Sequence, residues 1–483
     1  MGDKSIYLCA LCNSILAEDG SCILKCDTCG SGYPIVAGLR ILALNPEALL
    51  VAHASQMAGR AQELKTRREL LARFESERVS AEAQFRLRRD YEARQANQEL
   101  IAEAFRPVVQ HIEQQRQLSF LERLASYQTG WSFTQMTPYL YKDWYGTQEA
   151  RFVNKLFTNA IEDYCGGHSK AVAVLGCGAC GLLYEVSQFF SESYGVDLSL
   201  LTLLLAKRLL EGGEVTLHLS LPDDSFPRVQ REVRLKGAES KREGISLLAA
   251  NITHLPFASS SLSCVITQYL MNIVTDQRLL AEEVNRVLAP GGVWINFSTP
   301  GSMTYSDLPT HLDPSHFFNS HGFDVLEVSR QRCNLLDFSD VSDWTVTVEH
   351  SNMLFAVRKA RDLETAREAL FADYFSGRSE AILNATPKLT DRFSISISDR
   401  KLFSSSGTSD SHVLEVGAYD GNVLLRGSLP TEVTHFLSMF LQMLDGRTSV
   451  SQIIERLKTK FPHFAGERAV IVFLKSLQDM GIL

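Results

Sequence analysis

Residues 171–197 read AVAVLGCGACGLLYEVSQFFSESYGVD, and this stretch decides the fold. The apolar run at 172–175 predicts a buried parallel strand. It ends in a glycine-rich turn, Gly176-Cys177-Gly178-Ala179-Cys180-Gly181, which is followed by a helical stretch and a short strand ending at Asp197. Glycines let backbone approach a ligand closely, and an acid at the end of the second strand suits the hydroxyls of a ribose. The pattern therefore predicts a nucleoside site, and dinucleotide-binding proteins share it.

The residues after this stretch indicate which class of nucleoside-binding protein the chain resembles. Residues 248–251 predict a third strand with the loop Leu255-Pro256-Phe257, and residues 263–270 predict a fourth strand. A helix over 282–288 ends at Ala289-Pro290-Gly291-Gly292, before a fifth strand at 293–297. This order resembles class I S-adenosylmethionine (SAM) methyltransferases over roughly residues 128–358. We therefore expect a Rossmann-like α/β domain that binds SAM; a dehydrogenase is the alternative.

The resemblance implies a set of cofactor contacts. The glycine loop, including Cys177, would pass under the methionine portion of SAM, and Asp197 with Leu198 would meet the ribose. The adenine would lie against Asn251 and Ile252, and Gln268 would border the reacting centre. We interpret Cys177 and Cys180 as small packing residues, with a redox pair as the alternative. The contacts assigned to the loop are Gly176, Cys177, Gly178 and Gly181.

Five of the ten cysteines lie within the first 29 residues. Cys9 with Cys12 and Cys26 with Cys29 form two CxxC turns separated by 13 residues. Four thiolates satisfy tetrahedral Zn²⁺ and leave no open position, which predicts a structural site. Two alternatives are that Cys22 replaces Cys26 or that the turns hold no metal. Residues 32–42, GYPIVAGLRIL, resemble the tail of Trm112-like zinc ribbons, which implies a ribbon over residues 1–48.

Residues 49–127 predict a helical arm because they are rich in Ala, Glu, Gln, Arg and Leu. Its mixed charges are typical of a solvated helix face, and nucleic-acid contact is the alternative. Beyond the arm, the segments 138–151 and 291–297 resemble blocks of the carnosine N-methyltransferase family. That resemblance implies that Lys142 faces the methionine carboxylate and that Asn272 replaces a substrate-binding acid. Candidates around the reacting atoms are Asn272, Tyr305 and Tyr141.

Residues 212–245 are an insertion between the second and third strands. Alternating apolar residues on both sides of Pro222-Asp223-Asp224-Ser225 predict a β-hairpin. We leave open whether the hairpin is a lid or a surface elaboration. The SAM domain itself is expected to span residues 128–360.

The last part of the chain predicts a separate domain over residues 391–483, after a helix from Ala360 to Phe375 and a linker within 361–390. Strands are expected at 393–398, 413–416 and 422–425, and helices at 431–444, 450–460 and 469–480. The block Leu444-Asp445-Gly446-Arg447-Thr448 resembles PqqD-like winged-helix domains. This implies that a leader peptide is added as a strand to a sheet edge. The alternative is a structural or dimerising winged helix.

The amino-acid composition and net charge limit the functions that the chain can have. The net charge of −8 disfavours a dedicated nucleic-acid binder. No run of about 18 apolar residues and no signal peptide are found, which predicts a cytoplasmic protein without a membrane span. We expect a SAM-dependent methyltransferase that modifies a heteroatom of a peptide, preferably a side-chain nitrogen. The alternatives are a small-molecule imidazole or amine N-methyltransferase, a zinc-ribbon RNA methyltransferase and a scaffold without activity.

Overall fold

The structure is a computed structural model. It describes residues 6–17, 20, 22–76, 80–114, 133–166, 169–223, 226–271, 273–274, 276–299, 314–334, 338, 349–363, 369–390, 393–404, 407–418, 423–429, 431–461, 466–479 and 481–483.

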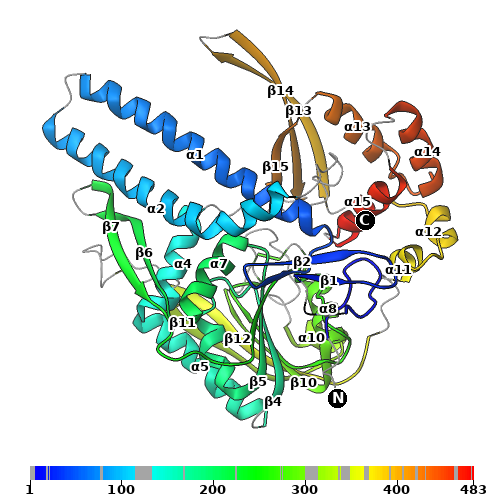
Figure 1. Cartoon of the computed structure of the whole chain (residues 1–483). Coiled ribbons are helices and arrows are strands. Elements are labelled where there is room, and N and C mark those ends of the chain that lie inside the picture. Colours follow the sequence, from blue (N-terminus) through cyan, green and yellow to red (C-terminus); the bar gives the residue numbers. More distant parts are fainter. Residues whose placement is uncertain are drawn as a thin grey trace.

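A ten-stranded sheet forms the centre of the molecule, in the order β1-β2-β3-β8-β5-β4-β9-β10-β12-β11 (Figure 1). Its middle five strands are parallel to one another: β4 (Ser169–Leu175), β5 (Phe190–Asp197), β8 (Ile245–Ala249), β9 (Leu262–Gln268) and β10 (Leu288–Ser298). The chain fills positions on one side of β4 and then moves to the other side with β9. Such a switch places the ligand crevice at the carboxyl ends of the strands next to β4. The expected Rossmann-like α/β sheet is therefore confirmed.

Helices cover both faces of this sheet. The helices α5 (Gln148–Tyr164), α6 (Gly181–Val186) and α7 (Leu200–Leu210) share one apolar core with one face. The helices α8 (Gln277–Val287) and α10 (Pro314–Ser320) cover the other face, around the fully buried Trp294. A short 3₁₀ turn, Ser187–Phe189, leads into β5. Burial on both faces explains why the parallel strands appear in the sequence as continuous apolar runs.

Several element boundaries differ from the sequence expectations, and three of them have a clear local cause. The fourth strand ends at Gln268 instead of residue 270, because Tyr269 has a φ of 52° and cannot continue the ladder. The fifth strand already begins at Leu288, with a register shift between Leu288 and Val293 that absorbs the Pro-Gly-Gly turn. The helix before it begins at Gln277, where the Asp276 side chain caps the Arg278 N–H at 2.9 Å.

The far edge of the sheet is antiparallel. β12 (Glu349–Lys359) lies between β10 and β11 (Phe323–Asn334) and runs opposite to both. The expected helix from Ala360 is wrong at its start. Ala360 and Arg361 donate their N–H groups to the carbonyl of Gly322, because they continue directly from β12. Among the described residues of this region, α11 covers Ala369–Phe375, and α12 (Glu380–Asn384) follows it.

The N-terminal ribbon, residues 6–45 as far as described, extends the central sheet at its other edge. It holds β1 (Ile23–Lys25), β2 (Gly32–Val36) and β3 (Leu39–Ile41). β3 pairs in parallel with β8, with Ile41 opposite Ala249, and the Leu42 N–H donates to the Ala249 carbonyl at 2.9 Å. The ribbon is thus joined to the SAM-domain sheet by backbone hydrogen bonds.

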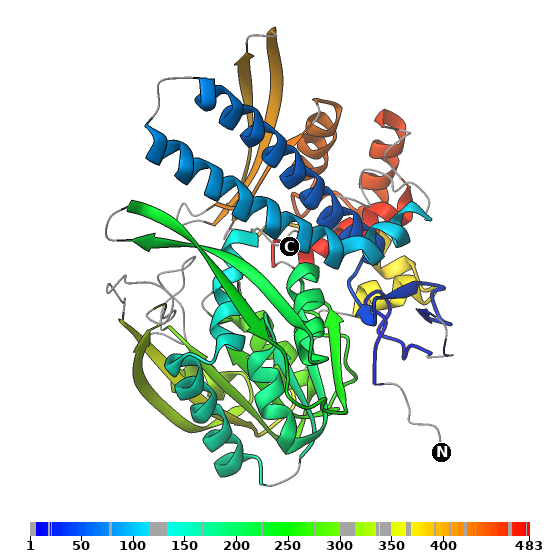
Figure 2. The ribbon, with the colours of Figure 1, turned by 60° about the vertical axis from the view of Figure 1, so that its left-hand side comes forward.

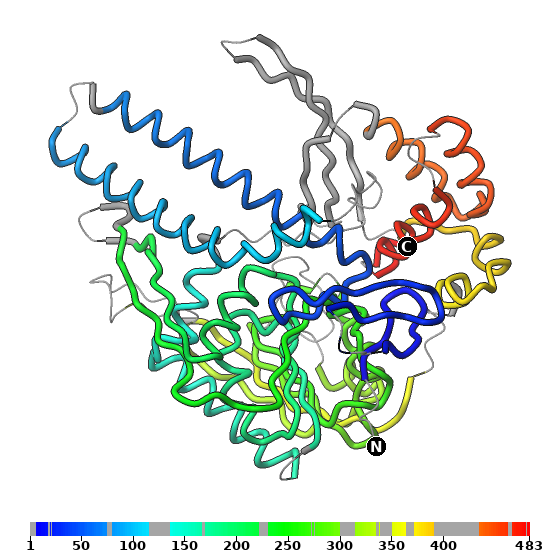
Figure 3. The backbone as a smooth tube through the Cα atoms, viewed as in Figure 1, coloured from blue at the N-terminus to red at the C-terminus, as the bar shows by residue number. Residues whose placement is uncertain are grey.

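The predicted arm consists of α1 (Pro46–Ser76) and α2 (Ala81–Glu113), which lie side by side and project from the body (Figures 1 and 3). The predicted hairpin is confirmed as β6 (Glu214–Asp223) and β7 (Phe226–Lys236). The Asn97 amide of α2 bonds the backbone N–H and carbonyl of His218 at 3.0 and 2.9 Å, which holds the hairpin along the arm. α4 (Phe133–Tyr145) also contacts the hairpin.

The last part of the chain, where a separate domain is expected over residues 391–483, contains a three-stranded antiparallel sheet in the order β13-β14-β15. Its strands are β13 (Phe393–Ser404), β14 (Gly407–Ala418) and β15 (Val423–Leu429); its later helices are α13 (Thr431–Gln442), α14 (Val450–Lys460) and α15 (Glu467–Asp479). All six predicted elements are present, and the strands are longer than expected. One apolar core is continuous from these helices to the ribbon and the α8 face, on the same side of the molecule (Figure 1).

Among the described helices, none combines the length and the apolar composition that crossing a bilayer requires.

Candidate functional site

The glycine loop after β4 is shaped to hold a ligand. Gly176 has a φ of 62°, which strains any residue with a side chain, and an added Cβ would lie 2.7 Å from Cδ1 of Leu270, so this position favours glycine. Gly178 has a φ of 50°, but a Cβ on it would meet only the Gly176 carbonyl, at 4.0 Å. The space above Gly178 is therefore open among the described residues, as a ligand lying on the loop requires.

Asp197, the last residue of β5, is hydrogen-bonded to the glycine loop that follows β4. Its carboxylate accepts the backbone N–H of Gly178 at 2.9 Å and that of Ser199 at 2.8 Å. Burial raises the pKa of the Asp197 carboxyl, and these two N–H donors oppose the rise. The neighbouring Leu198 is fixed through its carbonyl, which lies 3.0 Å from Nε2 of His53 in α1.

Helix α4 lies against the same loop. Asp143 accepts the N–H of Gly181 at 3.1 Å, and the indole of Trp144 donates to the Ala179 carbonyl at 2.7 Å. Lys142 is buried, with Nζ 4.7 Å from the centre of the Tyr269 ring, and burial lowers its pKa. Sequence reasoning missed Asp143 and Trp144, although both lie within the 138–151 block that pointed to Lys142.

The expected adenine contacts follow β8. Asn251 is buried, and its Oδ1 accepts the Thr253 N–H at 3.2 Å. Its Nδ2 is also buried and has no hydrogen-bond partner within the described part of the chain. A buried amide donor without an acceptor is costly, and a ring nitrogen of adenine would satisfy it. Ile252 is partly buried beside it.

A second group of buried and partly buried side chains lies beyond Gln268, the last residue of β9. The Tyr269 hydroxyl is 3.8 Å from Cys333 Sγ, and the Asn352 amide donates to the same sulfur at 3.2 Å. Asn352 is fully buried, and its Oδ1 has no partner among the residues described. Burial raises the pKa of both Tyr269 and Cys333. Cys333 and Asn352 belong to β11 and β12, after the recognisable motifs, and no sequence signal pointed to them.

Three expected residues near the reacting atoms have different outcomes. Asn272 and Tyr305 lie outside the described residues. Tyr141 is fully buried in α4, and its ring lies against Tyr145 and Phe338, with centroids 4.6 and 5.4 Å away. The two loop cysteines are also buried, with Cys177 and Cys180 Sγ atoms 3.4 Å apart.

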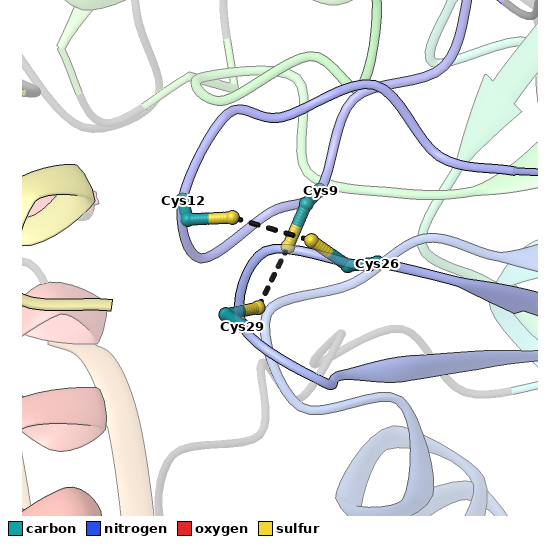
Figure 4. A group of neighbouring side chains, drawn as sticks. All are labelled: Cys9, Cys12, Cys26 and Cys29. Carbon is teal, nitrogen blue, oxygen red and sulfur yellow. Dashed lines mark hydrogen bonds between the residues drawn. The ribbon is translucent and has the colours of Figure 1, made fainter. Parts of the chain in front are cut away.

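The four expected metal ligands come together in the ribbon (Figure 4). The sulfur atoms of Cys9, Cys12, Cys26 and Cys29 all lie within 4.8 Å of one another. Cys9 Sγ is 3.5 Å from Cys29 Sγ, and Cys12 Sγ is 3.3 Å from Cys26 Sγ. A tetrahedron with Zn–S bonds of about 2.3 Å has edges of roughly 3.8 Å, so the donor set fits that ion. Cys22 is exposed and outside the cluster.

Comparison with known proteins identifies the central domain. The family described as a methyltransferase domain matches residues 174–296, from β4 to β10. The ubiquinone/menaquinone biosynthesis C-methyltransferase of Haemophilus ducreyi is 33% identical over 85 residues, which are 17% of this chain and 29% of that protein. The chain thus spans less than a third of this curated relative. Residues 174–296 are a methyltransferase domain of the SAM-dependent class, which favours this class over a dehydrogenase.

Several solved structures are similar to part of the chain. One is a chain of the complex between the Haloferax volcanii Trm112 methyltransferase activator and a candidate methyltransferase, with 15% identity, a TM-score of 0.30 and coverage of 44% of this chain and 92% of that chain. Another is a candidate methyltransferase from Bacillus halodurans, with 10% identity, a TM-score of 0.31 and coverage of 42% and 98%.

Proposed function

We propose that this chain transfers the methyl group of SAM to a side-chain nitrogen of a peptide. The observation that carries the transfer is the loop geometry within the methyltransferase domain, in which the Asp197 carboxylate accepts the Gly178 N–H beside open space. When bound, SAM supplies a methyl group on a positively charged sulfonium. The protein must then bind the cofactor, orient the nucleophile and exclude water.

The cofactor would be held at four points. The open backbone at Gly178 would lie under the methionine portion, and Asp197 would accept the ribose hydroxyls. The Asn251 Nδ2 donor would meet the adenine. Lys142 would face the methionine carboxylate, because α4 is held against the glycine loop by Asp143 and Trp144.

The acceptor would lie on the side of Tyr269 and Asn352. The unpartnered Oδ1 of Asn352 needs an N–H or O–H donor, and a nitrogen acceptor such as an imidazole or amine carries one. In the transfer, the nitrogen lone pair forms the new C–N bond, the C–S electron pair goes to sulfur, and the nitrogen releases a proton. Glu149, which accepts the Asn334 amide at 3.1 Å, is the candidate for the group that takes up this proton.

The peptide part of the proposal rests on the C-terminal domain. Its sheet has two edge strands, β13 and β15, and helices α13 to α15 follow in the order that resembles PqqD-like winged helices. An extended peptide can add to such an edge through backbone hydrogen bonds. A leader segment bound there would hold the rest of its peptide near the methyltransferase domain, in the cytoplasm.

The ribbon would hold a structural Zn²⁺ on Cys9, Cys12, Cys26 and Cys29, because four thiolates leave no position for a substrate. It would stabilise the sheet edge at β3 and β8.

The function is tested with the full chain, SAM and two sets of probes. One set contains synthetic peptides encoded by short reading frames next to the gene; the other contains carnosine, free histidine and structured RNA. We expect one methyl group to be added to a peptide, located at nitrogen by fragmentation. Methylation of carnosine or histidine alone would favour the small-molecule alternative, which the 138–151 and 291–297 resemblance supports. Methylation of RNA alone would favour the RNA alternative.

A further inference from the structure

The last helix of the chain touches the loop that is expected to bind adenine. The Thr253 hydroxyl donates to the backbone carbonyl of Asp479 at 2.8 Å, across 226 residues of sequence. Asp479 is the final residue of α15, and its carboxylate accepts Lys475 Nζ at 3.2 Å. These two charged side chains are 8% and 3% exposed, so the helix end is held in place by a buried ion pair.

The same threonine orients the adenine-facing amide. The Thr253 backbone N–H donates to Asn251 Oδ1 at 3.2 Å. This bond fixes which end of the amide points away from the loop and leaves Nδ2 as the open donor. A line of contacts therefore runs from the buried Asn251 donor, through Thr253, to the end of α15.

The contact between Thr253 and Asp479 is part of a larger interface between the C-terminal domain and the methyltransferase domain. An added Cβ on Gly481 would lie 3.2 Å from the Leu279 side chain of α8 and 3.9 Å from Asp276. The Gly481 φ of 74° turns the chain end into this space, and the Thr390 N–H donates to the Ile482 carbonyl at 2.9 Å. In both views the C-terminus lies against the body of the molecule (Figures 1 and 2). The C-terminal domain is therefore docked against α8 and against the loop after β8 that is expected to bind adenine.

We propose that Thr253 is a positioning residue through which docking of the C-terminal domain sets the affinity for the cofactor. This inference rests on the proposed SAM binding and adds a regulatory role to the domain. The adenine loop keeps its Asn251 amide in place because α15 anchors Thr253. By reciprocity, a ligand that orders the adenine loop must also stabilise the end of α15 by the same factor. A peptide on the C-terminal sheet would then alter cofactor affinity through this contact.

The variant Thr253→Val tests the contact in the full chain. Valine keeps the shape and the backbone N–H, so the Asn251 bond remains and only the hydroxyl bond to Asp479 is lost. We expect calorimetry with S-adenosylhomocysteine to show a dissociation constant raised roughly three- to tenfold, as the loss of one hydrogen bond implies. Thr253→Ser keeps the hydroxyl and should restore wild-type affinity.

Hydrogen exchange supplies the second readout. At saturating S-adenosylhomocysteine, wild type should show slowed exchange both in residues 250–258 and in 466–479. In Thr253→Val the loop should still be protected, while the protection of 466–479 by the ligand should be lost. Equal affinities of wild type and Thr253→Val, or α15 exchange that the ligand leaves unchanged in wild type, would overturn the proposal. A wild-type chain that binds neither SAM nor S-adenosylhomocysteine would overturn the proposed function as well, which separates the two failures.

Discussion

The carboxylate of Asp197 accepts the backbone N–H of Gly178 at 2.9 Å, so the acid that ends β5 reaches the loop that follows β4. The two strands are parallel neighbours, with Val196 opposite Leu175. Their carboxyl ends therefore meet at one edge of the sheet, and the bond sets the distance between the loop and the acid.

Replacing Asp197 should abolish most cofactor binding. Asp197→Ala removes the acceptor for the ribose hydroxyls together with the bonds to Gly178 and Ser199. Hydrogen bonds to a charged group contribute about 1.5–3 kcal/mol, so the dissociation constant for SAM should rise by roughly 10- to 150-fold in calorimetry. Asp324→Ala, which removes an exposed carboxylate from β11, is the matched control and should bind as wild type. Equal binding by Asp197→Ala would remove Asp197 from the site.

The residues next to regular strands could be predicted from the sequence, because a parallel sheet brings the ends of its strands to one edge. Asp197 is the last residue of β5, and Asn251 lies two residues beyond the end of β8, at the same edge of the sheet. The apolar runs within β4 and β9 were sufficient to predict that these segments are strands. The positions at which strands end were harder to predict. β9 stops before Tyr269 because that residue has a backbone φ of 52°, and no residue type in the segment indicates such a conformation.

The parts of the fold and of the site that could not be predicted depend on contacts between segments that are distant in the sequence. Thr253 and Asp479 are 226 residues apart, and Asn352 meets Cys333 across two antiparallel strands. A sequence pattern reports periodicity within an element, but it does not report which elements become neighbours. The ribbon is an example: its cysteine spacing predicted the cluster, whereas the parallel pairing of β3 with β8 came only from the structure.

Metal binding by the ribbon can be tested through its cysteines. We expect purified wild type to contain about one Zn²⁺ per chain, because four thiolates complete a tetrahedral site. Cys26→Ser should lose the metal and unfold at a lower temperature, because it removes one of the four ligands and the ribbon needs the bound metal to stay folded. Elemental analysis and thermal unfolding provide the measurements. Cys22→Ser is the control, because Cys22 is exposed and outside the cluster; loss of metal in this variant alone would show that Cys22 is a ligand.

Lys142 should contribute to cofactor binding through its charge. Burial lowers its pKa, and the Asp143 carboxylate beside it opposes that shift. Lys142→Met keeps most of the side-chain volume and removes the charge that we propose to face the methionine carboxylate. The loss of one charged hydrogen bond should raise the dissociation constant for S-adenosylhomocysteine by about 10- to 100-fold. Methylthioadenosine, which lacks that carboxylate, should bind wild type and variant equally. Lys155→Met, on the exposed side of α5, is the matched control. An equal loss of affinity for both ligands would argue for a structural role of Lys142.

His53 should make the stability of the chain depend on pH. Burial lowers its pKa from 6.5 to about 4, and Nε2 lies 3.0 Å from the Leu198 carbonyl beside the cofactor acid. Above pH 6.5 the ring is neutral in both the folded and the unfolded state. As the pH falls from 6.5 towards 4, the unfolded chain takes up a proton that the buried ring does not. The free energy of unfolding therefore decreases, by about 2 kcal/mol at pH 5. His53→Gln can still donate to the carbonyl but does not titrate in this range. Denaturant unfolding at pH 7.5 and pH 5 should show a smaller decrease for the variant than for wild type by about that amount. An identical decrease in both proteins would show that His53 does not cause it.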